Sequence, residues 1–441
     1  MRRAAPWLAA GLGLGLTLLA FWPGYLSWDS AYQWWQARSG QIDPTHPPVM
    51  VRLWQLSRMA MPDPGGMLLL QATLWWGALA LFADALGGSA TRRAGTVLLT
   101  GLWPPLLGLL PHLWKDVWLM ALFALAVACL VQDLRTPRRA WRVAALSALA
   151  LACAFRFNAL PGALPLLAWI AWRQWPRRKV GAAVATLAMA AVMQVFSTAV
   201  NHVPGGRDVP VWPSVAMWDL AAVSIAEDRL LFPPDWVDPG LTVDDLRRDF
   251  VEYVNVPSFA SGQLRLNYYY DYTPAQFAAL RAAWLSLPRE HGAAYAAHRA
   301  RVSQYLLGLR QAEQPDYLVL QPGVIAYKDN PALARPEGRV HGAVQSVLDR
   351  LVDAPVFAPW LYLLAALALL AWHAIRRPPG GPRALATMVA GSSLALALPL
   401  LLLSPSSDFR YLGWCVLAAW LAGWLYWPPE NRSPTPGSVW R

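Results

Sequence analysis

Charged residues are scarce in this chain of 441 residues: Asp, Glu, Lys and Arg make up 14% of it, whereas 56% is hydrophobic. Soluble domains carry about 25% charged residues. A soluble fold would also have to bury many apolar runs of membrane-spanning length. The composition therefore excludes an ordinary soluble domain and indicates a membrane protein.

Cysteine is almost absent as well. Cys129, Cys153 and Cys415 each lie within an apolar run and offer neither an extracellular pair nor a metal-ligand spacing, so we expect packing residues. No small-residue cleavage site follows the first apolar run, and we expect that run to stay as a helix. Internal repeats are not visible either.

Apolar runs long enough to cross a bilayer recur along the chain. They predict an all-α polytopic membrane protein with about ten spans. The predicted spans are residues 5–22, 67–86, 94–111, 117–133, 141–156, 158–174, 180–200, 355–375, 384–403 and 411–427.

Basic residues gather in every second loop, and such loops lie on the cytoplasmic side of membrane proteins. Both termini are therefore expected inside. The residues concerned are Arg2, Arg3, Arg92, Arg93, Arg135, Arg138, Arg139, Arg142, Arg173, Arg177, Arg178, Lys179, Arg376, Arg377 and Arg383. The net charge of +11 is largely this signal, which argues against nucleic acid as a partner.

Four parts follow from this pattern. They are an N-terminal membrane module (1–200) with a first external loop at 23–66, an external domain (201–354), a C-terminal membrane module (355–427) and a tail (428–441) expected to be disordered. Helix-start patterns at Thr242 and Thr273 predict a mainly helical external domain. In the first loop, apolar residues around Arg52 and Arg58 predict short helices in the interface plane.

The first external loop holds two candidate positions. Asp29 follows the first span and could act as a general base, or it could cap a helix that starts at Ser30. Asp43 and His46 precede two prolines that fix the backbone. His46 could take part in proton transfer or bind an anion, and the alternative is a stiff turn before an interfacial helix.

Two more candidates lie in turns between spans. Lys115 could hold a phosphate, or form a local ion pair with Asp116. Arg156, two residues before Asn158, would be costly at bilayer depth unless it were paired or wet, which favours a function. The alternative is an arginine that extends to the surface from a helix end.

The last candidate opens the final span, at Asp408, Arg410 and Tyr411. Arg410 could bind a phosphate with two parallel hydrogen bonds, or pair locally with Asp408. All five clusters map to the outer side. Together they predict a pocket for an anionic, partly lipidic ligand.

At these residues the chain resembles the GT-C superfamily of integral membrane glycosyltransferases. The similarity is carried by Trp28-Asp29-Ser30, Gln33, Gly40, Asp43 and His46-Pro47-Pro48 in the first external loop, with the clusters at Lys115, Arg156 and Asp408 as later blocks. Many family members carry Asp-Glu in this loop. Here Ser30 follows Asp29, which leaves one acid and leaves open whether a divalent metal (Mg or Mn) is used.

The resemblance implies a bacterial cytoplasmic-membrane enzyme that takes a sugar from a polyprenyl-phosphate donor on the outer face. It assigns catalysis to Asp29 with support from His46, and donor phosphate binding to Lys115, Arg156 and Arg410. Asp43, Asp116, Asn158, Asp408 and Tyr411 would support these residues. The reaction would invert the anomeric centre. The alternatives are a flippase for lipid-linked oligosaccharides, whose polar residues would lie nearer the midplane, and a protein like an O-antigen ligase or polymerase.

Overall fold

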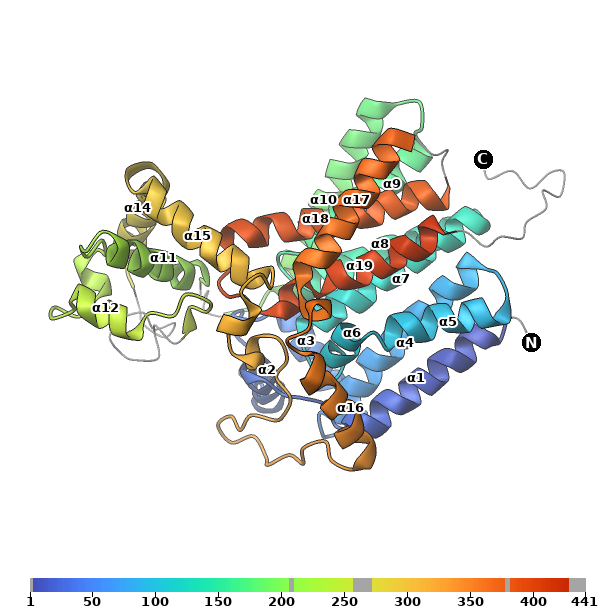
Figure 1. Ribbon diagram of the computed structural model, residues 1–441, viewed down its shortest axis with the longest axis horizontal. Helices are drawn as coiled ribbons and strands as arrows, with labels where there is room; N and C mark the ends of the chain where they lie inside the picture. The colour runs from blue at the N-terminus through green and yellow to red at the C-terminus, as the bar shows by residue number, and fades with distance from the viewer. Residues whose placement is uncertain (1–2, 206–209, 257–271, 377–380, 428–441) are drawn as a thin grey trace. The chain divides into compact units, whose positions relative to one another are not determined.

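The computed structural model describes residues 3–205, 210–256, 272–376 and 381–427. Every regular element in these ranges is a helix (Figure 1). This confirms the predicted all-α class. The tail at 428–441, which we expected to be disordered, lies outside the described residues.

The chain forms two compact units. Unit 1 contains residues 1–205, 319–397 and 409–441, and unit 2 contains 206–318 and 398–408. The stretch 319–354, which we assigned to the external domain, belongs to unit 1. The reason is a long-range contact: Leu26 donates its N–H to the Gly323 carbonyl and accepts one from Ile325, so that this stretch runs beside the first external loop.

The centre of unit 1 is helix α7 (Lys115–Arg135), and 94% of its most apolar window is buried inside the protein. It packs against α4 (Gly65–Leu86) and α8 (Arg139–Phe155), while α1 (Ala5–Phe21) and α5 (Ala90–Gly101) pack on α4. At about 1.5 Å per residue, α7 is about as long as the hydrocarbon core is thick.

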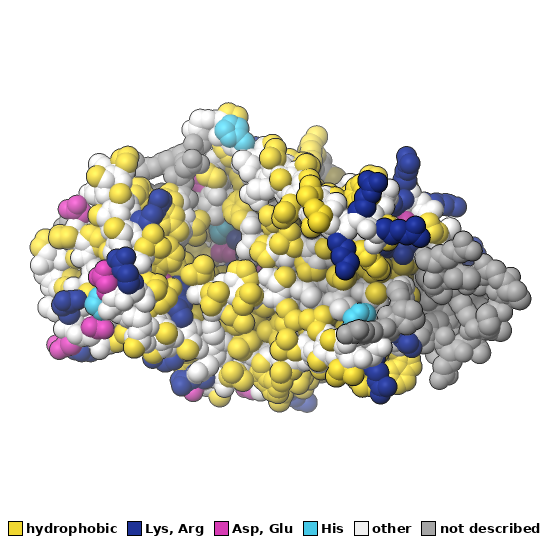
Figure 2. All heavy atoms as spheres, turned by 90° about the horizontal axis from the view of Figure 1, so that it is seen from above, with side chains coloured by type: hydrophobic (Ala, Val, Ile, Leu, Met, Phe, Trp, Pro, Cys, Tyr) yellow, Lys and Arg dark blue, Asp and Glu magenta, His cyan; other side chains and the backbone are white. Residues whose placement is uncertain are grey.

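The outer helices of unit 1 show their apolar side chains to the surroundings. Helices α10 (Lys179–Asn201) and α17 (Pro359–Arg376) have only 28% and 22% of their apolar windows buried. Val180, Leu187 and Val195 of α10 are exposed. In water this surface would be unfavourable, so it is typical of helices that face lipid. Figure 2 shows broad hydrophobic areas on the surface, with Lys and Arg side chains scattered between them.

Five described helices are long and apolar enough to cross a membrane: α4, α7, α10, α17 and α18 (Pro382–Leu403). The other predicted spans form shorter helices. These are α1, α8, α9 (Leu160–Gln174) and α19 (Gly413–Tyr426). The predicted span at 94–111 is not one continuous helix, because the chain breaks at Leu102 and restarts as α6 (Pro104–Leu109), whose first two residues are prolines.

Three short helices complete unit 1: α2 (Trp28–Ser39), α3 (Pro48–Ala60) and α16 (Arg339–Leu351). The helices predicted in the first external loop are therefore present. Both arginines of α3 hold it in place through backbone carbonyls. Arg52 donates to Val200 and His202, at the end of α10, and Arg58 donates to Ala37 in α2.

Unit 2 consists of α11 (Trp212–Ala226), α12 (Val243–Asp249), α14 (Pro274–Glu290) and α15 (Gly292–Leu306), with short 3-10 turns at Pro234–Trp236, Gln311–Glu313 and Asp316–Leu318. Capping boxes at Thr242 and Thr273 start α12 and α14, as predicted. Trp218 and Trp236 are fully buried within this unit.

Candidate functional site

Asp29 lies in the first turn of α2, which begins at Trp28 with Ser27 at the N-cap position. The alternative that Asp29 caps a helix starting at Ser30 was therefore wrong. Two hydrogen bonds fix this turn against the loop before α7: Ser30 Oγ donates to the Leu113 carbonyl at 2.8 Å, and Trp114 Nε1 donates to Ser27 Oγ at 2.7 Å. The Asp29 carboxylate is thus left for contacts outside its own helix.

Three basic side chains from distant parts of the sequence surround the Asp29 carboxylate. Arg410 Nη1 lies 3.0 Å from Oδ2, Lys115 Nζ lies 3.6 Å from Oδ2, and His46 Nε2 lies 3.8 Å from Oδ1. Of the Asp29 side chain 27% is exposed, against 9% for Arg410. The acid is therefore the part of this cluster that an incoming molecule can reach.

Lys115 and His46 also contact each other, with 2.9 Å between Lys115 Nζ and His46 Nδ1. Because a lysine ammonium can only donate, Nδ1 is the acceptor and the ring proton lies on Nε2, toward Asp29. Lys115 is the first residue of α7. The cluster therefore joins the central helix to the first external loop.

Asp43 shapes the turn that carries His46. Tyr32 donates its hydroxyl to Asp43 Oδ2, and Thr45 donates its backbone N–H to Asp43 Oδ1 at 2.9 Å. The Tyr32 ring meets the His46 ring edge-on at 5.8 Å between centroids. The stretch is thus a fixed turn before α3, and it also directs His46 into the cluster, while proton transfer or anion binding by His46 stays a prediction.

A second ion pair lies beside the first. Arg156, in the turn between α8 and α9, places Nη2 3.0 Å from Asp116 Oδ1, and 12% of its side chain is exposed. Its guanidinium lies over the Tyr411 ring at 4.7 Å, and the Arg410 guanidinium lies near that ring at 5.5 Å and over Trp114 at 4.5 Å. Tyr411 therefore links the two arginines. This burial does not fit the alternative, in which Arg156 extends to the surface from a helix end.

Two further residues, Asn158 and Asp408, were predicted to support the site. Asn158 is half-buried in the turn that carries Arg156. Asp408 belongs to unit 2, where Ser406 Oγ donates to it at 2.6 Å. The supporting roles of both residues stay predictions.

The charges around the acid set its protonation. Burial alone would raise the pKa of Asp29, but Arg410 and Lys115 outweigh it and hold the pKa well below its usual range. Burial and the neighbouring Lys115 lower the pKa of His46 to about 3, against the opposing effect of Asp29. At neutral pH the cluster therefore contains an ionised acid and a neutral imidazole.

A divalent metal does not fit this cluster. Among the described residues, no group of three or more His, Cys, Asp or Glu side chains could hold a metal ion. Mg²⁺ and Mn²⁺ prefer carboxylate and carbonyl oxygens, whereas here one carboxylate already faces two cations.

The contacts of His112, which opens the cluster at Lys115 and Asp116, and a group in unit 2 were not predicted from the sequence. His112 accepts a hydrogen bond from the Gln321 N–H at 3.0 Å and stacks on Trp114 at 4.1 Å, which supports the ring under Arg410. In unit 2, the fully buried His298 lies 3.1 Å from Asp219 and 2.7 Å from Glu252. Sequence spacing does not reveal the pairing of His112 with Gln321 or of His298 with Asp219, because these partners are far apart in the chain.

Comparisons of the chain with models of protein families, with curated proteins and with solved structures found no match.

Proposed function

We propose that this protein is a membrane glycosyltransferase of the GT-C type, which moves a sugar from a polyprenyl-phosphate donor to an acceptor on the outer face of the bacterial cytoplasmic membrane. The observation that supports the proposal best is the partly exposed Asp29 carboxylate, with Arg410, Lys115 and His46 around it. One acid beside a cluster of cations suits the transfer of a group from a phosphate.

In the proposed reaction, Lys115, Arg156 and Arg410 bind the donor phosphate and stabilise the charge that develops on it. An acceptor hydroxyl oxygen attacks the anomeric carbon and gives its proton to Asp29, while the bond from that carbon to the phosphate oxygen breaks. This single displacement inverts the anomeric centre. Neutral His46 orients Asp29 through its Nε2–H.

The ion pairs of Asp29 with Arg410 and Lys115 have a role in this reaction. With Arg410 at 3.0 Å, Asp29 is a weak base, since its charge is already compensated. A donor phosphate draws Arg410 and Lys115 toward itself, because guanidinium groups bind phosphate strongly. The carboxylate then becomes more basic. Donor binding thus prepares the acid for the acceptor.

The proposal includes ten spans. The five long helices are joined by α1, α8, α9, α19 and the broken pair α5–α6. Both termini then lie in the cytoplasm, and Asp29, His46, Lys115 and Arg410 lie at the outer mouth. The basic loops of the sequence support this orientation.

The test is sugar transfer by membranes that carry the Asp29→Asn variant. The amide keeps the shape but cannot accept the proton, so we expect the rate to fall by about 10² to 10⁴. Asp63→Asn is the control, because Asp63 only accepts the Gly65 N–H in the turn before α4. Unchanged transfer by the Asp29 variant, at equal protein level, would exclude Asp29 as the base. Movement of lipid-linked sugar across the membrane without a new glycosidic bond would instead favour a flippase.

A further inference from the structure

Two apolar cavities of unit 1 share α19 as their common wall. The first has a volume of about 400 Å³ and is lined by Trp103, Tyr362, Ala419, Trp420, Gly423, Trp424 and Trp427. The second has a volume of about 380 Å³ and is lined by residues of α17, α18 and α19, among them Leu369, Trp372, Ala390 and Tyr426. Ala419, Gly423 and Trp427 line both. The small size of Ala419 and Gly423 is what opens the space beside the helix.

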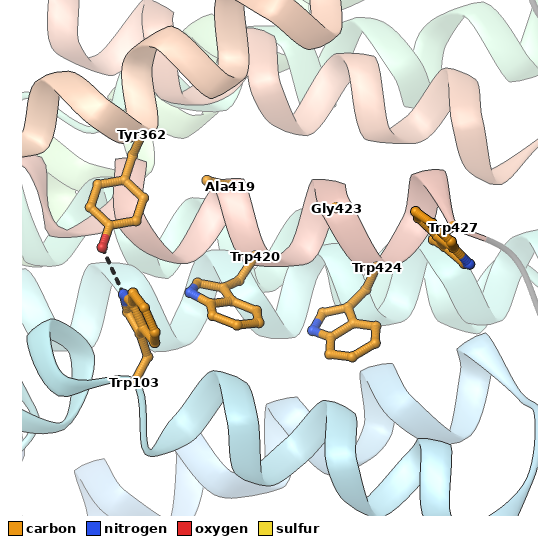
Figure 3. Close-up of a pocket in the computed structure, with 7 residues that line it drawn as sticks. All are labelled: Trp103, Tyr362, Ala419, Trp420, Gly423, Trp424 and Trp427. Carbon is orange, nitrogen blue, oxygen red and sulfur yellow. Dashed lines mark hydrogen bonds between the residues drawn. The ribbon is translucent and has the colours of Figure 1, made fainter. Parts of the chain in front are cut away.

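Two of the four indole N–H groups in the wall of the first cavity have hydrogen-bond partners within the protein. Trp103 Nε1 donates to the Tyr362 hydroxyl at 2.7 Å, as Figure 3 shows, and Trp424 Nε1 donates to Thr100 Oγ1 at 3.0 Å. Figure 3 also shows Trp420, Trp424 and Trp427 following one another along α19. The lining is therefore mainly hydrocarbon and aromatic carbon, which suits an apolar chain.

Arginines lie at the end of these cavities, beside their last lining residues. The Arg376 guanidinium lies over the Trp372 ring at 4.7 Å, and that of Arg383 over the Tyr426 ring at 5.6 Å. Arg92 donates to the backbone carbonyl of Trp427. Arg376 and Arg383 are exposed. The apolar cavities therefore end beside three positively charged side chains.

We propose that these cavities bind one anionic phospholipid, with its two acyl chains on either side of α19 and its phosphate at Arg376, Arg383 and Arg92. Two adjoining cavities that share α19 as a wall fit a lipid with two acyl chains, whereas a single isoprenoid chain would fill only one cavity. Three arginines at one end complement a net negative headgroup, and basic pockets between membrane helices bind such lipids in general. This inference does not depend on the proposed sugar transfer.

The experiment is a lipid titration of the delipidated full-length protein in detergent, read by native mass spectrometry. Phosphatidylglycerol, phosphatidylcholine and a polyprenyl phosphate are the three probes. We expect one phosphatidylglycerol to bind most tightly. Gly423→Leu should weaken it about tenfold, because a side chain there enters open space. Gly77→Leu is the matched control, since a side chain at Gly77 also meets no atom within 4 Å but lines neither cavity.

The double variant Arg376→Gln and Arg383→Gln tests the headgroup separately. Both residues are exposed, so the fold does not depend on them. Losing two cations should weaken phosphatidylglycerol binding by roughly thirtyfold and leave phosphatidylcholine binding unchanged. Equal binding of the two phospholipids to the wild-type protein, tighter binding of polyprenyl phosphate, or wild-type affinity in Gly423→Leu would each overturn the proposal.

Discussion

Arg410 is the residue on which most of the candidate site depends. It pairs with Asp29 at 3.0 Å, and its planar group packs on Trp114 and near Tyr411. Lysine could supply the charge but not these flat contacts. Local sequence suggests Asp408 as a partner, but nothing local suggests Asp29, which lies near the other end of the chain and pairs with Arg410. Residue types could therefore be recognised in the sequence, but their pairing required the fold.

His46 yields a prediction about stability and pH. Its ordinary pKa of 6.5 falls to about 3 in the folded protein. Between pH 6.5 and pH 3 this histidine is protonated in the unfolded chain but neutral in the folded protein. The free energy of unfolding therefore decreases as the pH falls, by up to about 1.4 kcal/mol per pH unit. His46→Gln removes this contribution. We expect the variant to lose less thermal stability than the wild type between about pH 6.5 and pH 4.

The measurement is the unfolding midpoint of the purified protein in detergent across this pH range. His202→Gln is the control, because His202 is exposed and its backbone carbonyl, not its ring, contacts Arg52. Burial lowers the pKa of His112 to about 3 as well, so a smaller slope of the same sign remains in the variant. Parallel curves for His46→Gln and the wild type would contradict the assignment.

Packing between elements depends on one tryptophan of α4. The Trp76 ring lies against Gly13 of α1 and Gly101 of α5, and Trp76 Nε1 donates to Thr17 Oγ1 at 3.0 Å. A Cβ added at Gly13 would lie 2.5 Å from the indole. Glycine at these positions therefore lets three helices approach one another around a large side chain.

Gly13→Ala should destabilise the protein by about 1 to 3 kcal/mol through this overlap. Gly11→Ala is the matched control two residues earlier on α1, where an added Cβ meets no atom within 4 Å and alanine favours the helix. Midpoints of thermal unfolding in detergent compare the two. A Gly13 variant as stable as the Gly11 variant would show that the helices can separate at little cost.

Hydropathy predicted the helices of the membrane part well because each apolar run has a helix within it. The exception at 94–111 is informative: its residues are apolar throughout, and only the pair Pro104-Pro105 signals the break before α6. Hydropathy also could not separate the 319–354 stretch from the external domain. The backbone bonds of that stretch to Leu26 depend on tertiary structure and leave no local pattern.

At the scale of the whole molecule, the proposed orientation places the two ends of the long helices in different compartments. Asp63 precedes α4, on the side of Asp29, and Arg139 begins α8 at the opposite end of α7. The three native cysteines are buried, so they give little background in thiol labelling.

A membrane-impermeant thiol reagent should therefore label Asp63→Cys in intact cells. It should label Arg139→Cys, an exposed position, only after the membrane is permeabilised. Labelling of both variants in intact cells would contradict the proposed topology, and labelling of Arg139→Cys alone would place the Asp29 cluster on the inner side.

The pairing of Asp29 with Arg410 and Lys115 means that the site contains its own competitor. Any phosphate that enters has to displace a carboxylate that is tethered to the same protein and so is present at high local concentration. Weakly binding or singly charged anions do not displace the Asp29 carboxylate, so only an anion above a certain affinity occupies the site. The same carboxylate returns to the cations once the product leaves. In the proposed cycle, the residue that accepts the proton is thus also the one that limits product retention.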